Sequence, residues 1–224
     1  MIPTINTVVA IDGPAASGKS TVARGVARAL NWLYLDSGAL YRGVTWQALE
    51  NGIRISAGPA LVGMVAELQI AFAIADGAIR FSLNDMPLGI EIRAPRVDKH
   101  VSAVAATPGV RQGVTRWLRK AAELGPLVAE GRDIGTVVFP DARHKFFLDA
   151  SPDERARRRY DELAERAEDV SPDEVGRALR RRDTLDSERD ADPLRAAPGA
   201  VAVDTTGLTI DEVVQAIVAR IREQ

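Results

Sequence analysis

Residues 13–20 have the types and the spacing needed to hold the phosphates of a nucleotide. They run Gly-Pro-Ala-Ala-Ser-Gly-Lys-Ser and fit the pattern G-x-x-x-x-G-K-S/T at every fixed position. Gly13 and Gly18 permit backbone angles that other residues avoid, so successive N–H groups can point at one phosphate. Lys19 can reach the β- and γ-phosphates, and Ser20 can offer its hydroxyl to Mg²⁺. The segment therefore predicts a loop that binds a nucleoside triphosphate.

The segments on either side of this loop test whether the match is a chance feature of an ordinary strand-to-helix turn. Residues 7–11 form a β-branched run typical of a buried strand, and Val22, Val26 and Leu30 recur at helical spacing. A helix that begins at the loop directs unpaired N–H groups and a favourable dipole toward an anion. The context therefore favours a phosphate site.

Ser37, Tyr41 and Arg42 follow a second strand, predicted at 32–35. Open α/β sheets bind ligands at the carboxyl ends of their strands, and a guanidinium with two hydroxyls suits a phosphate. The same residues also fit a helix cap at Asp36 or Ser37 beside an exposed arginine.

Arg132 and Asp133 follow a strand predicted at 127–129. Charges at such a position are costly unless a ligand or a partner matches them. The pair therefore predicts either ligand contacts or a structural ion pair between the two residues.

Arg182, Asp186 and Arg189 are spaced i, i+4 and i+7, so they share one face of a helix. By spacing alone, this set fits an ordinary surface ion pair as well as a binding face.

Arg155, Arg158 and Arg159 form one stripe of a helix that is predicted to begin at Ser151. A solvated helix with many ion pairs explains most of its charges. A mobile lid whose arginines close on the triphosphate is the sharper hypothesis.

The remaining elements complete a parallel sheet with one insertion. Strands are predicted at 145–148 and 200–203, and a helix from Ile210. Between residues 70 and 88 two alternating apolar runs surround tight-turn residues, which indicates an antiparallel meander. We expect it to be an inserted subdomain rather than part of the parallel sheet. Capping boxes are predicted at Ser151, Ser171 and Thr209, each with glutamate three residues later.

Composition excludes several classes of protein. The 224 residues are 46% hydrophobic and 27% charged, with a formal net charge of -2, which argues against a dedicated nucleic-acid binder. There is no cysteine, so disulfides and thiolate metal sites are impossible. Residues 1–6 do not resemble a signal peptide, and no apolar stretch is long enough to span a bilayer. We expect a cytoplasmic protein with no nucleic-acid or membrane partner.

The sequence does not support two kinds of protein that carry such a phosphate loop (P-loop). The chain has no N-K-x-D segment of a regulatory GTPase and no L-S-G-G-Q-like segment of a transport ATPase. The size, the insertion and the arginine clusters favour a small-molecule kinase. Three motifs then resemble the bacterial cytidylate kinase family, in order along the chain: Asp36-Ser37-Gly38-Ala39-Leu40-Tyr41-Arg42, the segment 130–142 that begins Glu130-Gly131-Arg132-Asp133, and the segment 182–189.

This resemblance implies an α/β fold: a P-loop parallel-sheet core with helices on both faces, an antiparallel β-containing insert that binds the nucleoside monophosphate (NMP), and a helical lid. The expected single domain divides into a core (1–38, 105–150 and 172–224), the NMP-binding insert (39–104) and the lid (151–171). The implied reaction is transfer of the γ-phosphate of ATP to CMP, and to dCMP, with Mg²⁺ as cofactor. A monomer is expected.

The resemblance also implies the role of each site residue. ATP is expected to bind Gly13, Pro14, Ala15, Ala16, Ser17, Gly18, Lys19, Ser20 and Thr21, with Ser20 on the metal. Catalysis is assigned to Lys19, Arg132, Arg155, Arg158 and Arg159. CMP is expected to bind Ser37, Tyr41, Arg42, Ser102, Arg111, Arg132, Asp133, Arg182, Asp186 and Arg189.

Within that set, Ser102 and Asp133 are expected to accept from the cytosine amino group, and Arg111 to donate to the ring nitrogen. Arg111 also fits a surface position on a helix predicted from Pro108 to Lys120. Two other functions stay open. One is a nucleotide-binding regulatory or structural protein without chemistry, and the other is a kinase for a different acceptor, such as uridylate, adenylate or shikimate.

Overall fold

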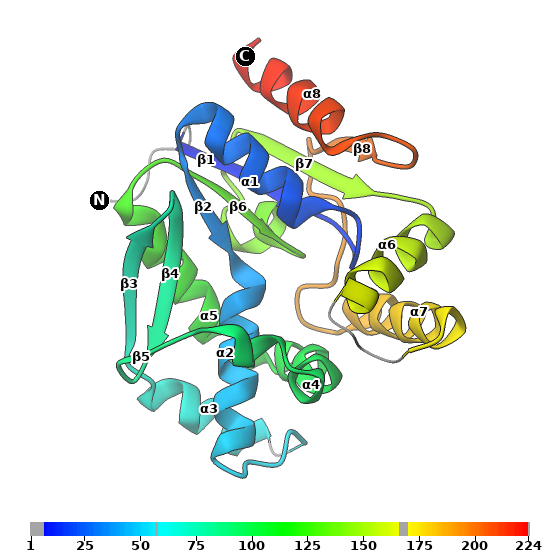
Figure 1. Cartoon of the computed structure of the whole chain (residues 1–224). Helices are drawn as coiled ribbons and strands as arrows, with labels where there is room; N and C mark the ends of the chain where they lie inside the picture. Colours follow the sequence, from blue (N-terminus) through cyan, green and yellow to red (C-terminus); the bar gives the residue numbers. More distant parts are fainter. Residues whose placement is uncertain (1–6, 57, 166–169, 224) are drawn as a thin grey trace.

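The structure, a computed structural model, describes residues 7–56, 58–165 and 170–223. Residues 1–6, where we expected no signal peptide, and residues 166–169 of the expected lid lie outside the described residues. The eight-stranded sheet has the order β3-β4-β2-β6-β1-β7-β8, with β5 paired to β4 (Figure 1). The strands are β1 (Val8–Asp12), β2 (Leu33–Asp36), β3 (Ile70–Ala75), β4 (Ala78–Leu83), β5 (Met86–Pro87), β6 (Leu127–Gly131), β7 (His144–Asp149) and β8 (Val201–Asp204).

The helices occupy the segments between these strands. They are α1 (Lys19–Leu30), α2 (Ser37–Glu50), α3 (Gly58–Glu67), α4 (Pro95–Ala105), α5 (Pro108–Ala121), α6 (Pro152–Glu165), α7 (Pro172–Glu188) and α8 (Ile210–Arg222). Short helical turns are η2 (Ile90–Arg93), η3 (Ala122–Leu124) and η4 (Ile134–Val138), the last of them π-helical. The predicted strands and the helices predicted after the phosphate loop and from Ile210 are all present, with ends that differ by at most about two residues.

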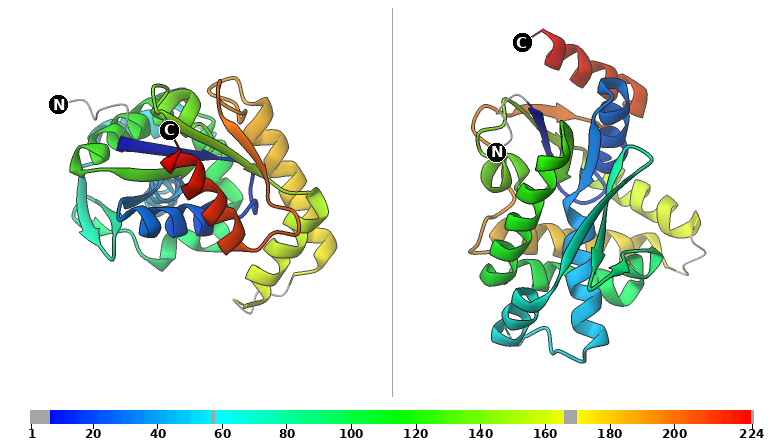
Figure 2. Two further views of the ribbon diagram at one scale, coloured as in Figure 1. Left: turned by 90° about the horizontal axis from the view of Figure 1, so that it is seen from above. Right: turned by 90° about the vertical axis from the view of Figure 1, so that its left-hand side faces the viewer.

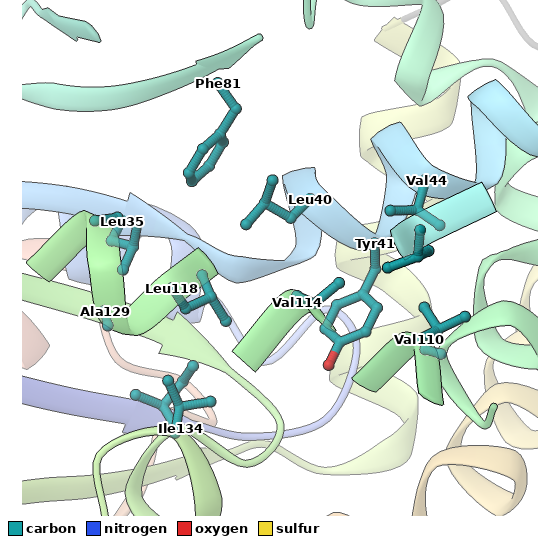
Figure 3. Close-up of a cluster of buried hydrophobic side chains, with 14 of the residues drawn as sticks. Leu35, Leu40, Tyr41, Val44, Phe81, Val110, Val114, Leu118, Ala129 and Ile134 are labelled. Atoms are coloured by element: carbon teal, nitrogen blue, oxygen red, sulfur yellow. The ribbon is translucent and has the colours of Figure 1, made fainter. Parts of the chain in front are cut away.

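Strand alternation separates two hydrophobic cores, because neighbouring side chains of a strand point to opposite faces. In β1, Val8 and Ala10 pack with α2, α3 and α5, whereas Val9 and Ile11 pack with α1 and α8. Helices therefore cover both faces of the sheet, as expected, and Figure 2 shows α1 beside α8. Figure 3 shows the first core, with side chains from α2 and α5 meeting those of the sheet.

The antiparallel strands are present, but our expectation that they stand apart from the parallel sheet is wrong. Tyr34 of β2 pairs in parallel with Ala78 of β4, and Tyr34 N donates to Gly77 O at 2.9 Å. The reason is that β2 would otherwise present an open edge with unpaired N–H and C=O groups. The tight turns are as predicted, since Asp76 and Gly77 both have positive φ.

Two of the three predicted capping boxes are complete. At Ser171 and Thr209 the hydroxyl and the glutamate three residues later bond each other's backbone N–H. At Ser151 the hydroxyl accepts from Glu154 N at 3.3 Å, while the Glu154 carboxylate binds Arg157 and Arg158. Within the described parts of the chain, no helix has the length and apolarity needed to cross a bilayer.

Candidate active site

The loops that follow β1, β2 and β6 meet at one edge of the sheet, because these strands are parallel neighbours. A cleft opens there between the sheet edge, α4, α6 and α7. It is lined by all ten residues expected to hold the acceptor, which are Ser37, Tyr41, Arg42, Ser102, Arg111, Arg132, Asp133, Arg182, Asp186 and Arg189. Lys19 and Ser20 of the phosphate loop line the same cleft, so the two expected sites meet there.

The phosphate loop has the backbone that its sequence predicts. Gly13 and Gly18 have φ of 157° and 83°, and Ala16 also lies in the left-handed region at 59°. A Cβ on Gly13 would stand 2.0 Å from Leu148 O, so only glycine fits there. Gly18 caps α1 without any side-chain hydrogen bond, which leaves the first N–H groups of that helix available to an anion.

Lys19 lies buried under this loop, only 6% exposed, and its Nζ donates to Pro14 O at 2.8 Å. Burial, reinforced by the neighbouring Arg132 charge, lowers the pKa of Lys19 to about 7. Such an environment disfavours the lysine charge until an anion arrives, which is the behaviour expected of a phosphate-binding group.

Ser20 donates to Glu130 Oε1 at 2.6 Å, and the Tyr34 hydroxyl donates to the same oxygen at 3.2 Å. Sequence reasoning missed Glu130 as a functional candidate, although an acid at the end of a buried strand was a usable signal. Among the described residues no group of three or more acidic, histidine or cysteine side chains could hold a metal. One hydroxyl and one carboxylate nevertheless fit Mg²⁺, which takes oxygen ligands and draws most of them from phosphates and water.

Ser37 and Arg42, which we expected on the acceptor phosphate, both line the cleft. Ser37 is buried and donates to Glu130 O at 2.8 Å. The Arg42 side chain is largely buried and forms an ion pair with Asp98 at 2.5 Å, so the exposed-arginine interpretation is wrong. The capping interpretation holds for Asp36, whose Oδ1 accepts from Ala39 N at 3.0 Å.

Arg132 pairs with Asp186 rather than with its neighbour Asp133, since Arg132 Nε donates to Asp186 Oδ2 at 2.8 Å. Asp186 is only 5% exposed, which excludes the surface ion pair that its spacing also allowed. Among the described residues Arg182 Nε is buried without a hydrogen-bond partner, and burial beside Arg132 lowers the pKa of Arg182 to about 10. A buried arginine in a cleft that has an N–H group without a hydrogen-bond partner is suited to bind an anionic or polar ligand.

Arg111 lies inside the cleft and is 2% exposed, so the surface interpretation of this residue is wrong. Its Nη2 donates to Asp133 Oδ2, its Nη1 to Ala105 O at 2.9 Å and its Nε to Asp192 Oδ2 at 2.7 Å. Burial raises the pKa of Asp133 even though Arg111 opposes that effect. Asp192 was missed because nothing in its local sequence marks it.

The three arginines of the expected lid reach three different places. Arg155 is buried behind the cleft, where Nη1 donates to Asp183 Oδ2 at 2.5 Å and to Ala15 O of the phosphate loop at 3.4 Å. Arg158 binds Thr205 Oγ1 and Thr205 O at 2.9 and 2.7 Å.

Arg159 pairs with Asp98 at 2.9 Å and lines the cleft. Asp98 therefore joins Arg42 of α2 to Arg159 of α6, and sequence reasoning missed it. The solvated-helix interpretation holds for Arg157, whose pairs with Glu154 and Asp161 are exposed. α6 thus carries exposed charges that pair along the helix as well as arginines that contact residues of other elements.

Comparison with known proteins gives one family. A family model described as "Cytidylate kinase" matches residues 9–223. A protein named "Cytidylate kinase" from Geobacter sulfurreducens is 44% identical over 97% of this chain and 93% of its own length. Another protein of that name, from Carboxydothermus hydrogenoformans, is 46% identical over 92% and 93%.

Among solved structures, an uncharacterized protein from Eubacterium ventriosum covers 97% of this chain and 99% of its own, with a TM-score of 0.52 at 14% identity. That likeness shows the fold alone.

Proposed function

The chain belongs to the cytidylate kinase family, and on that premise we propose that it transfers the γ-phosphoryl group of ATP to CMP, giving ADP and CDP. The observation that carries the proposal is the single cleft in which Lys19 of the phosphate loop faces the ten acceptor residues. We extend the proposal to dCMP as a second acceptor.

ATP lies with its phosphates on residues 13–21 in this proposal. Lys19 gains its full charge as the phosphates approach, because an anion raises a pKa that burial had lowered. Ser20 and Glu130 would hold Mg²⁺. The ion, when bound, neutralises charge on the β- and γ-phosphate oxygens.

A phosphate oxygen of CMP attacks the γ-phosphorus in line, and the bond from that phosphorus to the leaving oxygen of ADP breaks. The acceptor phosphate is already ionised at neutral pH, so no strong general base is required. Arg42 and Arg132 hold this phosphate with Ser37 and Tyr41. Arg132 and Lys19 also neutralise charge on the group in transfer, which makes catalysis a matter of position and electrostatics.

The sugar and the base lie deeper in the cleft. Arg182 and Asp186 bind the sugar hydroxyls, and Arg189 contributes to the phosphate. Ser102 and Asp133 accept from the cytosine amino group, while Arg111 donates to the ring nitrogen. The ion pair between Arg111 and Asp133 supports this arrangement, because it fixes an acceptor beside a donor. Uracil presents the opposite pattern at both positions.

The lid excludes water. We propose that residues 151–171 close over the triphosphate, with Arg155, Arg158 and Arg159 brought to its oxygens. The contacts of Arg158 with Thr205 and of Arg159 with Asp98 support this, because both partners lie beside the cleft rather than on α6 itself. The rest of the chain divides into the core (1–38, 105–150 and 172–224) and the NMP-binding insert (39–104). We further propose a cytoplasmic monomer whose partners are nucleotides only.

The test is a coupled assay of ADP release from ATP and Mg²⁺ with a panel of acceptors: CMP, dCMP, UMP, AMP and shikimate. CMP should be used with the highest catalytic efficiency, and ATP alone should be hydrolysed far more slowly. A different acceptor that clearly exceeds CMP would replace the proposed substrate. Release of ADP that no acceptor stimulates would favour a nucleotide-binding protein without transfer.

A further inference from the structure

Asp12 is the last residue of β1 and directly precedes Gly13 of the phosphate loop. Its backbone is fixed on both sides, because Asp12 lies opposite Gly131 of β6 and Phe147 of β7 in the sheet. Strand alternation places its side chain on the same face as those of Val8 and Ala10. That face is covered beside β1 by η4, the turn that follows Arg132 and Asp133.

The Asp12 carboxylate bonds the start of this turn with both oxygens. Oδ1 accepts from Ile134 N at 2.7 Å, and Oδ2 accepts from Gly135 N at 2.8 Å. The side chain is 2% exposed. Asp12, which directly precedes the phosphate loop, therefore holds two adjacent N–H groups of the segment that carries Arg132 and Asp133.

Other contacts also fix the position of η4 relative to the Asp12 carboxylate. The Ile134 side chain is fully buried in the core beneath Leu118 and Ala129 (Figure 3). Asp133 O accepts from Val137 N at 2.9 Å and from Val138 N at 3.1 Å. The peptide between Asp133 and Ile134 is thus fixed from both of its sides, and the side chains of Arg132 and Asp133 take their direction from it.

The position favours a carboxylate over other polar groups. Two adjacent N–H donors are matched by the two oxygens of a carboxylate, whereas an asparagine offers one oxygen and an NH₂ group that cannot accept. Burial raises the pKa of Asp12 to about 7 although both N–H groups lower it. A carboxylate kept at such a cost is best explained by a geometric task.

We propose that Asp12 is a positioning residue, which locks Arg132 and Asp133 to the phosphate loop so that acceptor and donor phosphates meet in line. This proposal rests on the function proposed above. The two hydrogen bonds of Asp12 lie within the proposed core. The distance between the proposed donor and acceptor phosphate sites therefore does not depend on the positions of the lid and the insert.

The test uses Asp12→Asn, which keeps the shape and removes one acceptor. We expect kcat/KM for CMP to fall by about 10- to 100-fold, the range that a small misplacement of reacting groups produces. KM for ATP should change less than twofold, and the preference for CMP over UMP should decrease because Asp133 is displaced. In the wild type the amide protons of Ile134 and Gly135 should resonate downfield, and at least one of them should move upfield in the variant.

Ile217→Ala, in the core between α8 and the opposite face of the sheet, is the matched control. It should lower the melting temperature and leave both Michaelis constants and the base preference unchanged. Asp12→Asn with the same pattern as this control would show a merely structural role and overturn the proposal. The amide shifts are measured without catalysis, so they test the lock even if CMP proves to be the wrong acceptor.

Gly135→Ala provides a second route if Asp12→Asn does not fold. A Cβ on Gly135 would lie 3.4 Å from Asp12 Oδ2 and 3.2 Å from Ala197 Cβ, so either the turn or Ala197 must give by a few tenths of an ångström. A selective loss of CMP turnover with KM for ATP retained is expected, smaller than in Asp12→Asn. Wild-type kinetics in Gly135→Ala although the Ile134 and Gly135 amides have shifted would show that the turn moves without effect on catalysis, and would overturn the positioning role.

Discussion

Arg132 Nε lies 2.8 Å from Asp186 Oδ2, and this pair joins the end of β6 to α7 across the cleft. Asp186 also lies near Arg182, and together the two arginines lower its pKa despite burial, so the carboxylate is charged at neutral pH. Asp186 therefore holds Arg132 in place, close to the charge of Arg182, before any phosphate arrives. The consequence is that the proposed acceptor site is organised in advance, which reduces the free-energy cost of binding.

Asp186→Ala should weaken the acceptor far more than the donor. The change removes the sugar contact in the proposed site and leaves Arg132 without its buried ion-pair partner. Steady-state kinetics should show kcat/KM for CMP reduced by about tenfold or more, consistent with loss of one charged hydrogen bond, and KM for ATP changed little. Asp161→Ala, which removes an exposed partner of Arg157, is the control. A loss of thermal stability alone would assign Asp186 a structural role.

Lys19→Ala should abolish most transfer while the fold persists. The lysine charge acts on the γ-phosphoryl group in the transition state, and loss of such a preorganised contact costs about 10²-fold or more in kcat. The assay is coupled ADP release at saturating CMP, with circular dichroism to verify folding. Near-normal turnover by a folded variant would remove the loop from its proposed role as the ATP site.

The same lysine makes a specific contribution to the pH dependence of stability. Its pKa is about 7 in the folded protein and near 10.5 in the unfolded chain. Between these values the unfolded chain binds more protons, so this group makes the free energy of unfolding increase with pH. The difference in that free energy, Lys19→Met minus wild type, should therefore decrease from pH 7 to pH 10. Urea unfolding without nucleotide measures it, and a difference that is constant with pH would contradict the depressed pKa.

Lid closure predicts a pattern of hydrogen exchange. An analogue that joins adenosine and cytidine through a polyphosphate should protect α6 more than either nucleotide alone, because closure needs both sites filled. Residues 216–222 of α8 lie away from the cleft and serve as the internal control. If α6 exchanges equally in the free and doubly bound protein, the segment is not a lid.

The sequence predicted well those parts of the fold that depend on local pattern. Short apolar runs located β1, β2 and β6, and the glycines of the phosphate loop required one backbone path. The boundaries of the insert were harder to predict. The pairing of Tyr34 with Ala78 joins two separate segments, and no local sequence pattern indicates that they meet in the folded chain.

The residues of the candidate site show the same difference between what local pattern predicts and what only the folded chain brings together. Asp133 and Asp186 stood in motifs and Arg111 was assigned by the family resemblance, so their place in the cleft was predictable, whereas their partners were not. Arg111 binds Asp192, which lies 81 positions away, and Asp12 binds Ile134 at a separation of 122. Spacing along one helix even suggested the wrong partner for Asp186, because only the folded chain brings Arg132 beside it.

The most direct test of the account is the reading of the base by Arg111 and Asp133. A mispaired buried polar group costs about 1–3 kcal/mol, so wild type should prefer CMP over UMP in kcat/KM by at least about tenfold. Arg111→Met should lose CMP activity and much of that preference, while Arg116→Met, exposed on the same helix, should keep both. Equal use of CMP and UMP by the wild type, or an unchanged preference in Arg111→Met, would contradict the account.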